Sequence, residues 1–224
     1  MKNENLNHAA APVEELDGGD RFNQWVMAHI RPIAWVCGII LALVIVFFAV
    51  LYGYIKPQKA AADEDMAKAA LYFQMGDFDK ALNGDDADCI GFEAIADDYS
   101  WFKQGDLAAM YAGLCYFQKG DYESAASYLE KADLDDAIYG PAAKMHLGDA
   151  YVELGQNEDA ISAYEKAVDA ESTVISPVAA KKLGILLLQE GQKEEAHEAF
   201  LTIKNKYPES AEAQDIDMYI AYAE

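Results

Sequence analysis

The sequence predicts an all-α protein in which one membrane-spanning helix is followed by a solenoid of repeated helical hairpins. Three observations lead to this prediction: an uncharged run at residues 33–55, a glycine-centred motif that recurs four times after it, and apolar residues at helical spacing around each recurrence. The 224 residues carry a net charge of −22. From residue 56 onward there are 14 Lys, no Arg and 34 Asp plus Glu, a net charge of −20. Such a surface repels phosphate backbones, which argues against nucleic acid as a ligand, and fits either a basic partner or simple solubility.

The uncharged run, IAWVCGIILALVIVFFAVLYGYI, predicts a transmembrane helix at 32–56. As an α-helix the run would extend roughly 35 Å, enough to cross a hydrocarbon core of about 30 Å. Trp35 lies near its start and Tyr52 and Tyr54 near its end, where interfacial aromatic residues are expected. The run is too long for a cleaved signal peptide, and the segment before it is also longer than such peptides usually have. Residues 1–31 are polar and predict a disordered tail, and basic residues on both sides leave the orientation open.

The recurring motif reads GDFDKA at 76–81, GDYESA at 120–125, GQNEDA at 155–160 and GQKEEA at 191–196. Successive motifs are 44, 35 and 36 residues apart, and a period near 34 with a helix on each side is the tetratricopeptide signature. Small residues at two positions let the helices of a hairpin approach closely, and a bulky residue fills the remaining space. Stacked hairpins then share a core that one hairpin cannot bury alone. Three units carry these residues in phase: Gly113, Ala125 and Leu129; Gly148, Ala160 and Tyr164; Gly184, Ala196 and Phe200.

The predicted repeat domain covers residues 62–224. It begins with a degenerate repeat at about 62–104, which contains an insert with the sequence FEAIADDYSWF. Three regular repeats follow at about 106–140, 141–176 and 177–208. The last stretch, 209–224, predicts a helix that caps the final hairpin, as repeat arrays require.

The sequence predicts no catalytic, cofactor or metal site. His8, His29, His146 and His197 form no HExxH or Cys/His cluster, and the acidic stretch GDDADC at 84–89 lacks the register of a calcium loop. Cys37 lies in the uncharged run. Cys89 and Cys115 are either free buried thiols or, in an oxidising compartment, a disulfide. We therefore expect a protein that is not an enzyme.

Protein binding is predicted for the concave face of the solenoid, which the first helix of each hairpin lines. Met and Phe would make an adaptable surface for a peptide or a partner helix, whereas the alternative is that many of these side chains pack against neighbouring helices. Lys181 and Lys182 are the basic residues expected there, without the Asn and Arg of a carboxylate clamp. The predicted surface comprises Leu107, Met110, Leu114, Phe117, Met145, Asp149, Val152, Ile185 and Leu188. In the insert, Tyr99, Trp101 and Phe102 either fill the join between the first two units or face a partner.

The order of a short polar N-terminus, one membrane helix at 33–55 and repeats directly after it resembles the YfgM-like tetratricopeptide proteins, which are ancillary subunits of the bacterial Sec translocon. The stretch ALNGDDADCIGFEAI, followed by GDLAAMYAGLCYFQKGDYESAASYLEKA, carries this resemblance most closely. The resemblance implies a single-pass protein of the bacterial inner membrane with a cytoplasmic N-terminus and a periplasmic repeat domain. It also implies association with SecYEG and a PpiD-like chaperone, near exported clients, and it offers no catalytic residues. Two other functions fit the repeats: a scaffold for envelope assembly or cell division, and a self-associating structural module.

Overall fold

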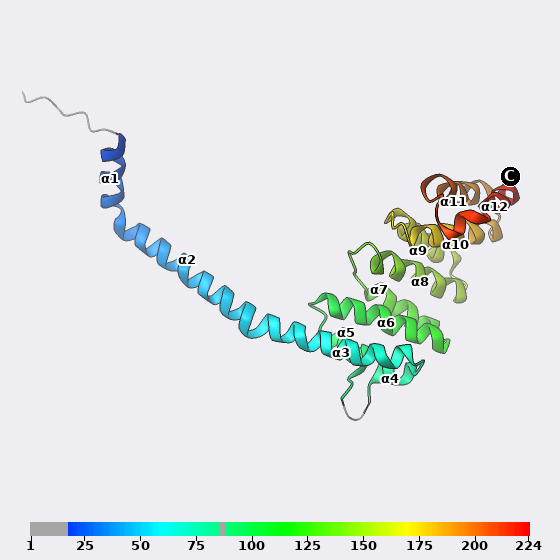
Figure 1. Cartoon of the computed structure of the whole chain (residues 1–224), viewed down its shortest axis with the longest axis horizontal. Coiled ribbons are helices and arrows are strands. Elements are labelled where there is room, and N and C mark those ends of the chain that lie inside the picture. The colour runs from blue at the N-terminus through cyan, green and yellow to red at the C-terminus, as the bar shows by residue number, and fades with distance from the viewer. Residues whose placement is uncertain (1–17, 86–87) are drawn as a thin grey trace, which may run out of the picture. The chain divides into compact units, whose positions relative to one another are not determined.

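The structure of the chain is a computed structural model that describes residues 18–85 and 88–224. The chain divides into two compact units, with the boundary between Lys56 and Pro57. All regular structure within the described ranges is helical, which confirms the predicted all-α class (Figure 1).

The first unit contains helix α1 (Gly18–Ala28), helix α2 (Ile30–Val50) and a π-helical turn, η1 (Leu51–Ile55). Helix α1 falls inside the segment for which composition predicted disorder. Local contacts at a spacing of four residues favour a helix there: the rings of Trp25 and His29 stack at a centroid distance of 4.9 Å, and Nδ1 of His29 lies 2.9 Å from the carbonyl oxygen of Trp25. Residues 1–17 of the predicted tail lie outside the described part.

Helix α2 is long and apolar enough to cross a membrane, and its apolar side chains have no protein cover within the described residues. Trp35 is 76% exposed and Phe47 is 62% exposed, so folding of the described chain does not bury this helix. The length and composition are those of a membrane span and also those of a signal sequence near an N-terminus. Either role removes the apolar surface from water.

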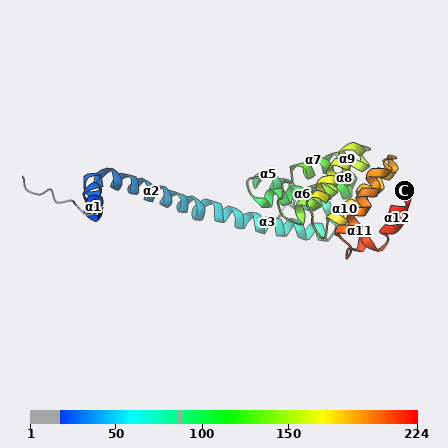
Figure 2. The same ribbon diagram turned by 90° about the horizontal axis from the view of Figure 1, so that it is seen from above.

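The second unit is a stack of helical hairpins, followed in chain order in Figure 1; Figure 2 shows α5, α7 and α9 along one side of it. Three regular hairpins pair a longer first helix with the second helix that follows. Their helices are α6 (Lys103–Lys119) with α7 (Tyr122–Lys131), α8 (Tyr139–Glu153) with α9 (Asn157–Asp169), and α10 (Ser176–Gln189) with α11 (Lys193–Lys206). The unit begins with α3 (Lys56–Gln74), α4 (Phe78–Asn83) and α5 (Gly91–Asp98), and ends with the 3-10 turn η2 (Ala211–Gln214) and α12 (Ile216–Ala223).

The recurring glycines form the turns between the two helices of each hairpin. At Gly120 the backbone N–H donates to the carbonyl of Phe117 at 3.0 Å, and the side chain of Asp121 accepts from the N–H of Ser124 at 3.1 Å. One residue thus ends α6 and the next caps α7. The φ angles are +76° at Gly76, +79° at Gly120, +71° at Gly155 and +78° at Gly191, a conformation in which a side chain is strained.

Inside each regular hairpin, the predicted small residues do bring the helices together. A Cβ atom added to the first-helix glycine would lie 2.3–2.6 Å from the bulky side chain of the second helix, which is far too close. The three contacts are Gly113 with Leu129, Gly148 with Tyr164 and Gly184 with Phe200. The alanines of the second helices, at 125, 160 and 196, have no exposed surface. These positions confirm the predicted packing of the repeats.

The degenerate first repeat is completed by its insert. Helix α4 has six residues, so it is too short to act as a second helix, and α5, formed by the insert, packs against α6 instead. An aromatic cluster holds this part together: the ring of Phe92 on α5 stacks on Tyr111 of α6 at 5.2 Å, and Phe73 of α3 meets Tyr111 edge-on at 5.3 Å.

The C-terminal helix α12 packs on the last hairpin. Ile216, Ile220 and Ala223 are buried on its inner side, and the ring of Tyr219 lies 5.3 Å from that of Phe200. The stack therefore ends with its apolar surface covered.

We expect the variant Gly184→Ala to lower the thermal unfolding temperature, with a loss of about 1–3 kcal/mol, because its Cβ would overlap the ring of Phe200. Far-UV circular dichroism of the full chain in detergent measures this. Combining it with Phe200→Leu should cost less than the sum of the two single changes, since the smaller side chain leaves room for the methyl group. If the losses of the two single changes were strictly additive, the close approach of the two helices would not be the reason that a glycine occupies position 184.

Candidate functional site

The first helices of the regular hairpins, α6, α8 and α10, carry the residues predicted to bind a partner. Most of them are half-buried side chains that pack on the core and keep part of their surface open. These are Leu107, Leu114, Phe117, Asp149, Val152, Ile185 and Leu188. Together they provide an apolar surface with one acidic group.

Met110 and Met145 are not part of this open surface. They are 5% and 7% exposed and belong to the hydrophobic core. Since α6 and α8 are each covered by helices of two hairpins, their apolar stripe is wider than that of a helix packed on one side, and the methionines fall within it. The prediction that they line the surface is therefore corrected.

Two of the predicted residues meet in a small pocket between repeats. Val152 of α8 and Ile185 of α10 line a cavity of 170 Å³, together with Tyr164, Lys182, Leu186 and Gln189. Its lining combines apolar side chains with the Lys182 ammonium and the Gln189 amide. It is large enough for one side chain of a partner, not for a cofactor.

Asp149 is the centre of a polar network at the edge of this pocket. Its Oδ1 accepts from the hydroxyl of Tyr164 at 2.7 Å and from Nζ of Lys182 at 2.8 Å, and its Oδ2 lies 3.3 Å from Nδ1 of His146. Burial by itself would raise the pKa of this carboxyl, but the hydrogen bonds from His146, Lys182 and Tyr164 together bring the pKa below its ordinary value. Asp149 is therefore ionised and joins α8, α9 and α10.

The two lysines expected on this face are both neutralised. Nζ of Lys182 is bound to Asp149, and Nζ of Lys181 lies 2.6 Å from Oδ1 of Asp215, next to the capping helix. Neither ammonium group is available to bind the terminal carboxylate of a peptide. This geometry agrees with the absence of a carboxylate clamp inferred from the sequence.

The three aromatic residues of the insert are placed differently from one another, and the alternative that one of them faces a partner stays a prediction. Tyr99 is buried and its hydroxyl donates to Asp65 of α3 at 2.9 Å, which joins α3 to the insert. Phe102 is half-buried against the core. Trp101 is 93% exposed and faces away from the protein.

The residues that bear reactive groups are placed as structural residues. Cys89 and Cys115 are free and buried, and burial raises the pKa of the Cys115 thiol to about 12, so this thiol stays protonated. Within the described residues, no three His, Cys, Asp or Glu side chains are grouped to hold a metal ion.

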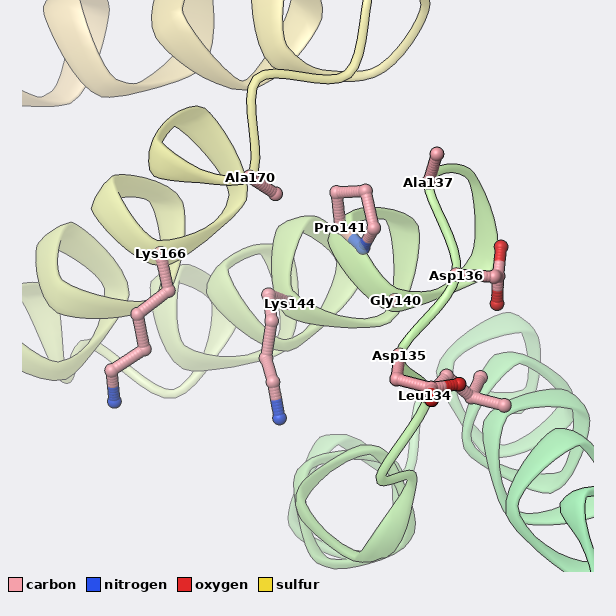
Figure 3. A pocket seen from close by; sticks show the side chains of 9 residues that line it. All are labelled: Leu134, Asp135, Asp136, Ala137, Gly140, Pro141, Lys144, Lys166 and Ala170. Atoms are coloured by element: carbon pink, nitrogen blue, oxygen red, sulfur yellow. The ribbon is translucent and has the colours of Figure 1, made fainter.

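The sequence analysis missed a set of cavities on the opposite side of the first helices. A cavity of 540 Å³ lies where the loop before α8 meets the end of α9, with Ala137, Pro141 and Ala170 around it (Figure 3). In Figure 3, Lys144 and Lys166 extend side by side on one flank, and Asp136 lies on the other. The sequence offers no signal for this cavity, because its lining comes from a loop and two helices that meet only in the folded hairpin.

The hairpin geometry and the interhelical surface define a tetratricopeptide-repeat protein. Solved structures with the same fold include the MamA protein, with 19% identity over 73% of this chain and 90% of MamA, at a TM-score of 0.53. Another is a Podosopora anserina protein described as a kinesin light chain with nearly identical TPR-like repeats, with 17% identity over 72% of this chain and 84% of that one, at a TM-score of 0.54. At these identities the likeness concerns the fold alone. No curated protein matches the chain.

The chain belongs to the family described as "T7SS, ESX-1 secretion system protein EccA1, N-terminal domain", whose model matches residues 40–217. This match covers the whole stack of regular hairpins and the second half of α2. The YfgM-like resemblance agrees with it on tetratricopeptide repeats and differs on the particular family.

We expect Asp149→Asn to lower the stability of the repeat unit by about 1–3 kcal/mol, because the buried Tyr164 hydroxyl and the Lys182 ammonium lose a charged acceptor. Since the folded-state pKa of Asp149 is lowered, its contribution is present above the ordinary carboxyl value of 3.8 and is lost as the pH falls through the folded value. The difference in melting temperature between variant and wild type should thus narrow in acid.

Thermal unfolding from pH 7 to pH 3 measures this difference. Asp217→Asn is the control, because its ion pair with Lys204 is exposed and should add nothing measurable. An equal effect of both changes would contradict a special role for Asp149.

Proposed function

We propose that the chain is a non-catalytic, membrane-anchored interaction subunit of a protein-export machine, with the SecYEG translocon and a PpiD-like chaperone as its partners. It is a single-pass protein of the bacterial inner membrane, with a cytoplasmic N-terminus and the repeat unit in the periplasm. The observation that carries this proposal is a repeat unit with open interhelical surfaces in the same chain as an uncovered apolar helix.

The anchor supports the membrane part of the proposal. Side chains along α2, such as Leu41, Val46 and Phe47, are about half exposed or more, and a helix that is apolar on all sides is stable in lipid rather than in water. Lys56 lies over the ring of Tyr52 with Nζ 4.1 Å from its centroid, which suits the end of a membrane span, where both side chains reach the interface.

The surface of the repeat unit supports a protein partner. The open side chains of the candidate concave face are apolar or acidic, and Lys181 and Lys182 there are bound to carboxylates. A surface of this kind suits peptide or helix binding and disfavours anionic ligands.

Two lines of similarity favour protein export. The family takes its description from a protein of the ESX-1 secretion system, and the order of anchor and repeats resembles the YfgM-like translocon subunits. Both concern secretion, and they differ in the machine. We favour SecYEG because the order of one apolar helix followed directly by repeats is that of the YfgM-like translocon subunits.

Purification of the tagged full-length chain from bacterial membranes in mild detergent tests the proposal. We expect SecY and a PpiD-like chaperone at near-stoichiometric yield, measured by quantitative mass spectrometry. A chain whose residues 33–55 are replaced by an unrelated single-pass helix is the matched control, and shows whether the anchor or the repeats carry the association.

Recovery of envelope-assembly or cell-division proteins instead would reject the translocon and indicate a different scaffold. Recovery of the chain alone, with a mass that rises with concentration, would indicate a self-associating module. Recovery of ESX-type secretion proteins would keep the export function and change the machine.

A further inference from the structure

Two neighbouring grooves on the side of the second helices differ sharply in charge. The α7–α9 groove lies over α8 and is lined by Glu130, Lys144, Leu147, Tyr151, Asp159, Ser162, Ala163 and Lys166, with a volume of 260 Å³. The α9–α11 groove lies over α10 and has a volume of 390 Å³. It is lined by Glu165, Val168, Asp169, Ala180, Leu183, Leu187, Glu195, Glu198, Ala199 and Thr202.

The grooves are built from equivalent repeat positions, 36 residues apart between the last two hairpins. The position of Lys144 is occupied by Ala180, that of Lys166 by Thr202, and that of Ser162 by Glu198. Two acids and two lysines line the first groove, whereas four acids and no lysine line the second. The substitution of a few side chains on the same backbone therefore creates the acidic groove.

The floor of the α9–α11 groove is apolar. Ala180, Leu183 and Leu187 lie along one side of α10, and Val168 and Ala199 close the flanks from α9 and α11. The floor residues are 0–7% exposed, so the groove is a recess in a packed surface. Its volume is within the range of sites that hold ligand groups.

The rim of this groove carries four negative charges, and one of them, Asp169, interacts electrostatically with Lys206. Glu165, Asp169, Glu195 and Glu198 are exposed, and none of them forms an ion pair within the described residues. The paired lysines of α10 and α11 bind acids outside the groove: Lys181 binds Asp215, Lys182 binds Asp149, Lys204 binds Asp217 and Lys206 binds Glu171. A cationic partner would relieve the repulsion between the four rim carboxylates.

We propose that the α9–α11 groove binds a basic amphipathic helix of a protein partner. Apolar side chains of that helix contact Leu183 and Leu187, and its Lys and Arg side chains reach the four rim carboxylates. The methylene stems of Lys and Arg cover apolar surface while their charges stay in water, which suits a groove with an apolar floor and an acidic rim.

Charge argues against the other occupants. Anionic lipid and nucleic acid are repelled by the four carboxylates. A second copy of this chain has a net charge of −22 and would bring acids to acids. The proposal rests on the interaction function proposed above and is independent of which export machine is involved, so a failure to recover SecY does not bear on it.

A synthetic amphipathic helix of Leu and Lys, with a photo-reactive group at one apolar position, is the probe. It is added to the full chain in nanodiscs of neutral phosphatidylcholine, with empty nanodiscs as the blank and a Leu and Glu peptide as the charge control. We expect saturable binding of the Lys peptide only, weakened by salt, with cross-links mapped by mass spectrometry to α9, α10 and α11.

Matched variants separate the groove from general acidity. The triple change Glu165→Gln, Glu195→Gln and Glu198→Gln should weaken binding about tenfold, as expected when three exposed charge pairs are lost. The control triple Glu123→Gln, Glu153→Gln and Glu224→Gln removes the same charge from exposed positions outside the groove and should leave binding unchanged. All six side chains are exposed, so folding is preserved.

A second variant replaces residues of the α9–α11 groove with those at the equivalent positions of the α7–α9 groove. Glu198→Ser with Thr202→Lys gives the α9–α11 groove two residues of its neighbour and should also weaken binding, by less than the triple change because it shifts the charge by two units and not three. The proposal would be overturned if both triple variants lost binding equally, if cross-links mapped outside α9, α10 and α11, or if the Glu peptide bound as well as the Lys peptide. Cross-links between two copies of the chain would identify a self-interface instead and would equally overturn it.

Discussion

The close approach of the two helices inside each hairpin is the contact on which the rest of the repeat unit depends. Gly148 has no side chain, so the ring of Tyr164 lies directly on the backbone of α8. That position brings the Tyr164 hydroxyl within 2.7 Å of Asp149, which in turn holds Lys182 of the next hairpin. A missing Cβ atom thus determines both the packing of one hairpin and the polar link to its neighbour.

Some of the acidic side chains hold helices together, which composition does not reveal. Tyrosine hydroxyls donate to carboxylates between helices: Tyr99 to Asp65, Tyr116 to Glu93, Tyr151 to Glu130 and Tyr164 to Asp149. The hydrogen bond to Glu130, together with burial, raises the pKa of Tyr151 to about 12, so its hydroxyl remains a donor at physiological pH. Other acids, such as those of the α9–α11 groove, have no such partner within the described residues and are the ones free to meet a cationic ligand.

The limits of prediction from sequence differ between the fold and the surface. Glycines and alanines at repeat spacing identify the hairpins, because the same steric requirement recurs in every unit. The helical phase predicts Met110 and Met145 to face the open surface. It gives the direction of a side chain around the helix axis, but not how many neighbouring helices cover that side. The burial of the two methionines at 5% and 7% depends on the helices of adjacent hairpins. The sequence also does not predict that Tyr99 is buried while Trp101 is exposed, since the two lie two residues apart in an insert that does not follow the repeat pattern.

The sequence by itself determined the helical class, the turn glycines, the contact of Gly184 with Phe200 and the apolar run at 33–55, because each follows from local sterics or from hydropathy along the chain. Only the tertiary structure decided which charged side chains form ion pairs within the protein. Lys181 and Lys182 are adjacent in sequence, yet they bind acids on different helices, Asp215 and Asp149. Charge pairing between segments depends on how the hairpins stack, and for that reason the acidic groove over α10 becomes visible only in three dimensions.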